Sequence, residues 1–175
     1  RGSHAPIATG DGTLSAMAIW ACPRRCHRRY VPLVASPAPT NVIAHRGANR
    51  RARENTLEAF SLALRLGATG IESDVWVTRD GAAVLDHDGV VRRGLRRPRI
   101  AELERQDLPA HIPTLVELLD LVDPLFPISL DLKDQAALDP VLRAIEGRNP
   151  ERLWLCHPAA DTVEAIQRSG VALRT

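Results

Sequence analysis

The sequence has very little lysine, few cysteines and no long apolar run. Lys133 is the only lysine among 175 residues, and arginine supplies every other basic side chain. A chain that uses arginine wherever a positive charge suffices is expected to keep lysine where a compact ammonium group is required. We therefore predict a functional role for Lys133, at a site that a guanidinium group does not fit.

The three cysteines, Cys22, Cys26 and Cys156, are an odd number without the spacing of a disulfide framework. We expect them to be reduced thiols, which predicts a cytoplasmic protein. Cys22 and Cys26 beside His27 could begin a metal knuckle. No second pair of ligands follows, however, so we interpret them as ordinary residues.

Residues 1–41 are predicted to be a disordered or non-native leader, with a cleaved signal as the alternative. The apolar stretch 14–22 is shorter than the ~20 residues that span a bilayer, and four arginines follow it, whereas a secretory signal has its charges first. The leader holds five arginines and one aspartate, which leaves residues 42–175 with a net charge of −2. We therefore expect no nucleic-acid partner and no stable membrane insertion.

Residues 42–175 predict a regular alternation of strands and helices. The expected strands are 41–44, 71–77, 82–85, 128–133, 153–156 and 171–173. Helices are expected from about residues 57, 115, 138 and 162, and two of them have capping-box sequences, Asn55 to Glu58 and Thr114 to Glu117. Alternation of this kind is typical of a parallel sheet or barrel, in which the loops after the strands build the site.

Two of the expected strands carry polar side chains on one face. Glu72 and Asp74 share a face because alternate residues of a strand point the same way. Two adjacent carboxylates at a partly buried site cost several kcal/mol unless they are neutralised, and a hard divalent cation is the simplest partner. In residues 128–133, apolar and polar residues alternate strictly, which brings Asp131 and Lys133 to one face.

Two histidines stand at or near strand ends, where they can converge with these carboxylates. His45 and His87 form a potential acid and base pair that works near neutral pH. Three carboxylates indicate an oxygen site for Mg²⁺ or Ca²⁺ rather than zinc. Arg46 and Lys133 beside such a metal suit a substrate with a phosphoryl group.

Taken singly, these residues have simpler interpretations. A histidine at a strand end is more often structural, and Glu72 could be an ion-pair partner of Arg46 or Lys133. Their joint placement favours a site. The arginine-dense stretch 92–99 is interpreted as a solvated surface loop, with steering of an anionic substrate as the alternative. His111 and His157 are interpreted as structural.

Six short motifs follow one another in an order and spacing that resemble the glycerophosphodiester phosphodiesterases. They are His45-Arg46-Gly47, Glu54-Asn55-Thr56, Glu72-x-Asp74, Thr78-x-Asp80-Gly81, His87-Asp88 and Ile112-Pro113-Thr114-Leu115. The resemblance extends from about residue 42 to residue 133 and more loosely to the end of the chain. No single motif is specific for this family, but the set of six motifs is.

This resemblance implies an α/β fold of the TIM-barrel (β/α)8 type, here truncated to about five strands, with residues 42–175 as a partial phosphodiesterase domain. It implies metal-dependent hydrolysis of glycerophosphodiesters to glycerol 3-phosphate and an alcohol, with Mg²⁺ or Ca²⁺. By position, the implied roles are His45 and His87 as the catalytic pair, Glu72, Asp74 and Asp131 as metal ligands, Arg46 and Lys133 as phosphate contacts, and Glu54 at or behind the metal.

Two departures from the family pattern bear on these expectations. The family usually has glutamate where this chain has Asp131, and a closed barrel needs ~8 strands and ~250 residues. Two other functions therefore stay open. One is a phospholipase-like lyase on the same barrel, which releases a cyclic phosphate. The other is a truncated binding or scaffold relic without activity.

Overall fold

The structure, a computed structural model, describes residues 42–123, 126–148 and 152–169. The strands are β1 (Ile43–His45), β2 (Gly70–Val77), β3 (Ala83–Leu85), β4 (Ile128–Leu132) and β5 (Leu153–Cys156). The α-helices are α1 (Leu57–Arg65), α2 (Leu115–Leu121), α3 (Leu138–Ile145) and α4 (Ala160–Arg168), and short 3₁₀ helices cover Ile100–Glu102, Arg105–Asp107 and Gln135–Ala137. The predicted leader and the strand predicted at 171–173 lie outside the described residues.

Four parallel strands form the sheet in the order β1-β2-β4-β5, and β3 pairs with β2 beside this path. The predicted alternation of strand and helix is wrong at β3, which follows β2 without a helix between them and runs antiparallel to its end. The reason is the short connection between them, because antiparallel strands can be joined by a tight turn, whereas a parallel pair needs a crossover. Gly81 (φ +83°) supplies the positive φ in this turn.

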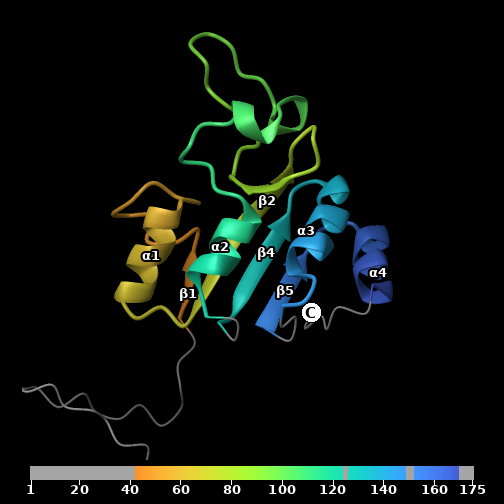
Figure 1. The fold of residues 1–175 in the computed structure, drawn as a ribbon. Coiled ribbons are helices and arrows are strands. Elements are labelled where there is room, and N and C mark those ends of the chain that lie inside the picture. Colours follow the sequence, from red (N-terminus) through yellow and green to blue (C-terminus); the bar gives the residue numbers. More distant parts are fainter. Residues whose placement is uncertain (1–41, 124–125, 149–151, 170–175) are drawn as a thin grey trace, which may run out of the picture. The chain divides into compact units, whose positions relative to one another are not determined.

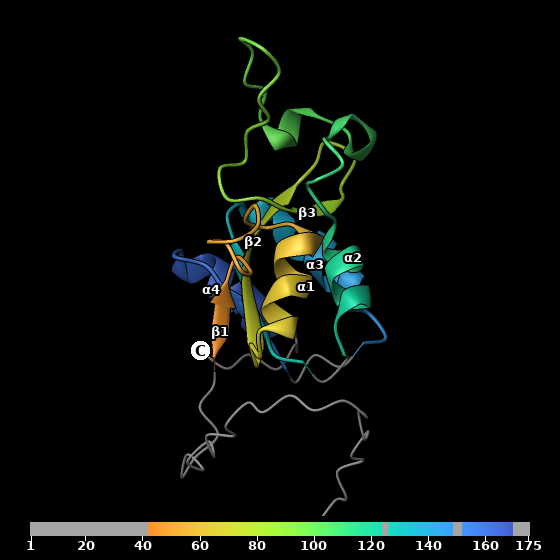
Figure 2. The same ribbon diagram turned by 90° about the vertical axis from the view of Figure 1, so that its left-hand side faces the viewer.

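Helices α1, α2 and α3 pack together on one face of the sheet. Figure 1 shows α1, α2 and α3 in front of the sheet, and Figure 2 shows the same helices from the side. The buried core joins Ile71 and Val75 of β2 and Leu130 of β4 to Phe60 of α1 and Leu118 of α2. The alternate residues of these strands, which include the predicted site residues, therefore stand on the opposite face.

Only one of the two predicted capping boxes forms. Thr114 caps α2 and exchanges hydrogen bonds with Glu117, as predicted. At α1 the prediction is wrong, because Thr56 is the N-cap and accepts from the N–H of Ala59 (3.2 Å). Asn55 precedes the helix in a left-handed conformation (φ +53°), and its side chain is used elsewhere.

The loop between β3 and α2 has a small core of its own. Its buried residues are Val84, Val91, Ile100, Leu108 and Ile112, and Trp76 packs against them. The expected solvated loop is therefore anchored at its base, while its arginines stay exposed. All described residues belong to one compact unit. Among them, no helix has the length and apolar character needed to cross a membrane.

Candidate active site

The turn that follows β1 provides the first part of the site. Arg46 (φ +56°) and Gly47 (φ +77°) both adopt the left-handed conformation, which is uncommon for a residue with a side chain. Position 47 requires glycine, because a Cβ there would lie 2.7 Å from the backbone carbon of Ala59 in α1. The Arg46 N–H donates to the carbonyl of Glu72 (2.9 Å), which holds the turn against β2.

The sheet register places the predicted site residues side by side. His45 of β1 pairs with Glu72 of β2, and Asp74 of β2 pairs with Asp131 of β4. Residues paired between neighbouring parallel strands point to the same face, so these four side chains share the face opposite α1, α2 and α3. His45 Nε2 lies 3.6 Å from Glu72 Oε2. The predicted common face of Glu72 and Asp74 is thus confirmed.

Asp74 is the buried centre of the site, with a side chain only 1% exposed. Its Oδ2 accepts a hydrogen bond from Asn55 Nδ2 (3.0 Å) and lies 2.9 Å from Arg46 Nε. Its Oδ1 lies 3.0 Å from Lys133 Nζ. Burial alone would raise the pKa of this carboxyl, but the hydrogen bonds from Asn55 and Lys133 outweigh burial and lower the pKa below its ordinary value.

Lys133 connects two of the three predicted metal ligands. Its ammonium group pairs with Asp74 and donates a hydrogen bond to Asp131. Burial would lower the pKa of Lys133, but the bonds to Asp131 and Asp74 outweigh it and raise the pKa. The compact ammonium group thus lies between two carboxylates on adjacent strands, and its functional role stays a prediction.

One oxygen of the Glu72 carboxylate lacks a hydrogen-bonding partner among the described residues. Its Oε2 is buried and accepts no hydrogen bond from the described residues. The neighbouring His45 nitrogen, at 3.6 Å, is too distant for one. Burial, together with the negative charge of Asp74, raises the pKa of Glu72. This side chain therefore has an unsatisfied need for a positively charged or proton-donating partner.

His87 reaches the same end of the sheet through β3. The backbone N–H of Asp86 donates to the carbonyl of Asp74 (3.2 Å), so the chain is still held against β2 just before His87. His87 Nδ1 lies 2.8 Å from Asp88 Oδ1. A carboxylate only accepts hydrogen bonds, so the proton of neutral His87 belongs on Nδ1 and Nε2 is left free.

Glu54 and Asn55 support the site from the loop before α1. Glu54 Oε2 accepts a hydrogen bond from Arg46 Nη1 (3.3 Å), so it contacts a cation of the site. Asn55 is buried, donates to Asp74 and accepts from Ser73 Oγ (2.8 Å). Sequence reasoning missed this role of Asn55. The available signal was that asparagine tolerates a positive φ and that Thr56 was an equally good cap.

The donor set fits a hard divalent cation, although the side chains are not gathered around one. Within residues 42–123, 126–148 and 152–169, no three histidine, cysteine, aspartate or glutamate side chains form a ready metal cluster. Arg46 and Lys133 instead neutralise Asp74 and Asp131. The unpartnered Glu72 oxygen beside the charge of Asp74 is nevertheless the kind of oxygen ligand that Mg²⁺ or Ca²⁺ accepts.

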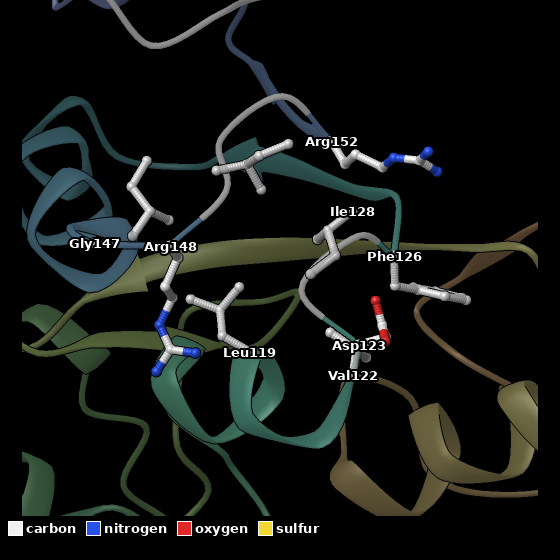
Figure 3. Close-up of a pocket in the computed structure, with 10 residues that line it drawn as sticks. Leu119, Val122, Asp123, Phe126, Ile128, Gly147, Arg148 and Arg152 are labelled. Carbon is white, nitrogen blue, oxygen red and sulfur yellow. The ribbon is translucent and has the colours of Figure 1, made fainter.

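A separate apolar cavity of about 340 Å³ lies at the other end of the strands. Figure 3 shows Leu119 of α2, Val122 just after this helix and Ile128, the first residue of β4, among the residues that line it. The candidate site lies where the parallel strands end, so this cavity is not part of it. His157, predicted to be structural, accepts a hydrogen bond from the N–H of Ala159 (3.0 Å).

Comparison with known proteins places this geometry in a family. The family model described as "Glycerophosphoryl diester phosphodiesterase family" matches residues 45–141. A glycerophosphodiester phosphodiesterase of Caldanaerobacter subterraneus subsp. tengcongensis is 35% identical over 133 residues, which cover 64% of this chain and 55% of that protein. The chain belongs to the glycerophosphoryl diester phosphodiesterase family.

Solved structures of this family show the same fold. The Thermotoga maritima glycerophosphodiester phosphodiesterase matches with a TM-score of 0.66 and 31% identity, over 71% of this chain and 57% of that one. An Oleispira antarctica phosphodiesterase, solved with the product sn-glycerol-3-phosphate, matches with a TM-score of 0.66 and 23% identity. The fold is α/β and of the truncated TIM-barrel type that the motifs predicted. The chain spans about half the length of the Caldanaerobacter relative.

Proposed function

We propose that this site hydrolyses glycerophosphodiesters to glycerol 3-phosphate and an alcohol. The observation that carries the proposal is the placement of His45, Glu72, Asp74, Asp131 and Lys133 on one face, at the end of three adjacent parallel strands. Family membership supports a phosphodiester substrate, and the product bound to the Oleispira enzyme supports glycerol 3-phosphate as the product.

In the proposed reaction, a water oxygen attacks phosphorus and the bond from phosphorus to the alcohol oxygen breaks. One histidine of the pair His45 and His87 accepts the proton of the water, and the other donates a proton to the departing alcohol oxygen. The hydrogen bond between His87 Nδ1 and Asp88 supports this role, since it leaves Nε2 available for proton transfer.

Glu72, Asp74 and Asp131 are the residues that we propose to hold a Mg²⁺ or Ca²⁺ ion. When bound, the ion would supply positive charge against the phosphoryl oxygens. Arg46 and Lys133 stand next to these carboxylates, so they are placed to contact the phosphate of the substrate. Glu54, which bonds to Arg46, would position that guanidinium group.

Alanine at either histidine tests the proposed roles. We expect His45→Ala and His87→Ala to lower kcat by ~10²-fold or more, because each removes a general acid or base. Metal affinity, measured by calorimetric titration with Ca²⁺ and Mg²⁺, should stay close to that of the wild type. His157→Ala is the matched control, since His157 is not one of the proposed catalytic residues and accepts a hydrogen bond from the N–H of Ala159, and it should leave kcat unchanged. A large fall in metal affinity in either site variant would make that histidine a ligand instead.

A further inference from the structure

The loop between β3 and α2 carries a basic hairpin with an apolar tip, residues 90–99. Arg93 and Arg96 exchange backbone hydrogen bonds (2.9 and 3.0 Å), and Gly94 (φ +59°) and Leu95 form the turn between them. A Cβ added at Gly94 would meet nothing within 4 Å, so the tip stands in open space. Leu95 is completely exposed, at 105% of its reference area.

The charge of this hairpin is of one sign and largely unpaired. Residues 89–100 contain five arginines and no acidic residue. Among the described residues, Arg92, Arg96 and Arg97 have no hydrogen-bonding or ion-pair partner for their side chains, whereas Arg93 donates to the carbonyl of Asp107. Residues 42–175 as a whole have a net charge of −2 even with these five arginines, so the residues outside the hairpin are acidic on balance. The hairpin is therefore a local source of positive potential.

The base of the hairpin is anchored by buried residues and backbone hydrogen bonds, so the tip projects from an ordered support. Val91 and Ile100 are buried in the small core under the loop. The Val91 N–H donates to the carbonyl of Pro98 (2.9 Å), and the Ile100 N–H donates to that of Gly89 (2.8 Å). The loop extends beyond the ends of β2 and β4, as Figure 1 and Figure 2 show. A surface that contacts the tip would therefore lie on the same side as the candidate active site.

We propose that the hairpin binds the surface of an anionic lipid bilayer. The free arginines would pair with phosphate groups of the lipid head groups, and Leu95 would enter the boundary between head groups and acyl chains. A nucleic acid fits less well, because a single strand is bound on aromatic side chains and the hairpin has none. The apolar residue between arginines is what favours a membrane over a purely polyanionic partner.

Vesicle co-sedimentation of the whole 175-residue chain tests this proposal. We expect the chain to sediment with vesicles of phosphatidylcholine containing about one third phosphatidylglycerol, and only weakly with phosphatidylcholine alone. Added salt should weaken the binding. The triple variant Arg92→Gln, Arg96→Gln, Arg97→Gln should lose about a hundredfold in partition coefficient, at about fivefold for each arginine near the surface.

Two substitutions of Leu95 distinguish a membrane from another polyanion. Leu95→Ser should weaken vesicle binding by about tenfold, because a buried leucine side chain is lost. Leu95→Trp should strengthen it, since tryptophan prefers the membrane interface. Unchanged vesicle binding in both variants would show that Leu95 does not enter the bilayer. This result would overturn the proposal, because contact by charge alone does not distinguish a membrane from another polyanion such as RNA.

A second triple variant controls for net charge. Arg65, Arg143 and Arg168 are exposed on α1, α3 and α4, and their replacement by glutamine removes the same charge outside the hairpin. This variant should bind vesicles within about twofold of the wild type. The arginines of residues 1–41 are present in every variant, so they do not affect the comparison. An equal loss in both triple variants, or no sedimentation of the wild type, would refute the role of the hairpin.

Hydrolysis of soluble glycerophosphocholine tests the active site independently of membrane binding by the hairpin. The Leu95→Ser chain should hydrolyse it at the wild-type rate in the absence of vesicles, because Leu95 contacts no residue of the site.

Discussion

Replacing Asp74 with alanine is expected to lower the free energy of unfolding by about 3 kcal/mol and to reduce hydrolysis below detection. The side chain is almost completely buried, and its removal leaves Arg46 and Lys133 without their shared partner and Asn55 without its acceptor. Breaking a buried charge pair costs ~3–5 kcal/mol. Because Arg46 and Lys133 keep some access to water, we expect a loss of unfolding free energy at the lower end of this range. Urea denaturation followed by circular dichroism measures the change.

Asp120 provides a matched control for this substitution. It also pairs with an arginine, Arg148, at 2.6 Å, but its side chain is 61% exposed. An exposed pair contributes less than ~1 kcal/mol, so Asp120→Ala should be much milder. Equal effects of the two substitutions would show that the network around Asp74 does not stabilise the fold.

The contribution of Asp74 to stability should depend on pH in a defined direction. Its pKa is lower in the folded chain than the ordinary value of 3.8, so the folded state favours the ionised form. The contribution is therefore complete above about pH 4 and is lost as the pH falls through the folded pKa. The difference in stability between wild type and Asp74→Asn should therefore shrink as the pH falls below 4.

Replacing Glu72 with glutamine is expected to have opposite effects on activity and stability. Hydrolysis should fall by about a thousandfold, since a bound metal ion supplies several kcal/mol of transition-state stabilisation. In metal-free buffer at pH 7, however, the variant should be more stable than the wild type. Glutamine removes a buried charge that lies close to Asp74 and has no hydrogen-bonding partner for Oε2.

The sign of this stability change follows from the pKa of Glu72. Burial and Asp74 raise it above the ordinary value of 4.5, so the folded state holds the proton more tightly than the unfolded state does. Ionisation of Glu72 therefore costs stability as the pH rises from about 4.5 through the folded pKa. The advantage of Glu72→Gln should be present at pH 7 and absent below pH 4.

Divalent cations should make the wild type more stable than Glu72→Gln, the reverse of the order in metal-free buffer. A cation that binds only the folded chain stabilises it by ~2.7 kcal/mol at one hundred times its Kd. Ca²⁺ or Mg²⁺ should therefore raise the thermal midpoint of the wild type and leave that of Glu72→Gln unchanged. Glu58→Gln, which removes an exposed charge on α1, should respond to metal as the wild type does. An equal rise in midpoint for Glu72→Gln would remove Glu72 from the metal site.

The parts of the fold and site that follow a local pattern could be predicted from the sequence. The strict alternation in 128–133 predicted which residues of β4 face the helices and which share a face with Asp131. Thr114 and Glu117 lie at the spacing of a capping box, and the box forms. The two carboxylates of β2 share a face because the side chains of any strand alternate.

The parts that depend on contacts between distant residues could not be predicted. Asn55 and Thr56 are both good helix caps, and a hydrogen bond from Asn55 to Asp74, 19 residues away, decides between them. Burial of the apolar run 82–85 was evident, but its antiparallel pairing with β2 is set by the preceding turn. Which cation neutralises which carboxylate depends on the left-handed conformation of Arg46, which no local signal predicted.

Phosphorus NMR of glycerophosphocholine incubated with the chain and Ca²⁺ or Mg²⁺ tests the central proposal most directly. The proposed hydrolysis predicts that the diester signal disappears and that glycerol 3-phosphate is the phosphorus-containing product from the start of the reaction, with no product from Glu72→Gln over the same time. A cyclic phosphate as the first product would instead indicate a lyase. No turnover by the wild-type chain would contradict the proposal and indicate a binding or scaffold role.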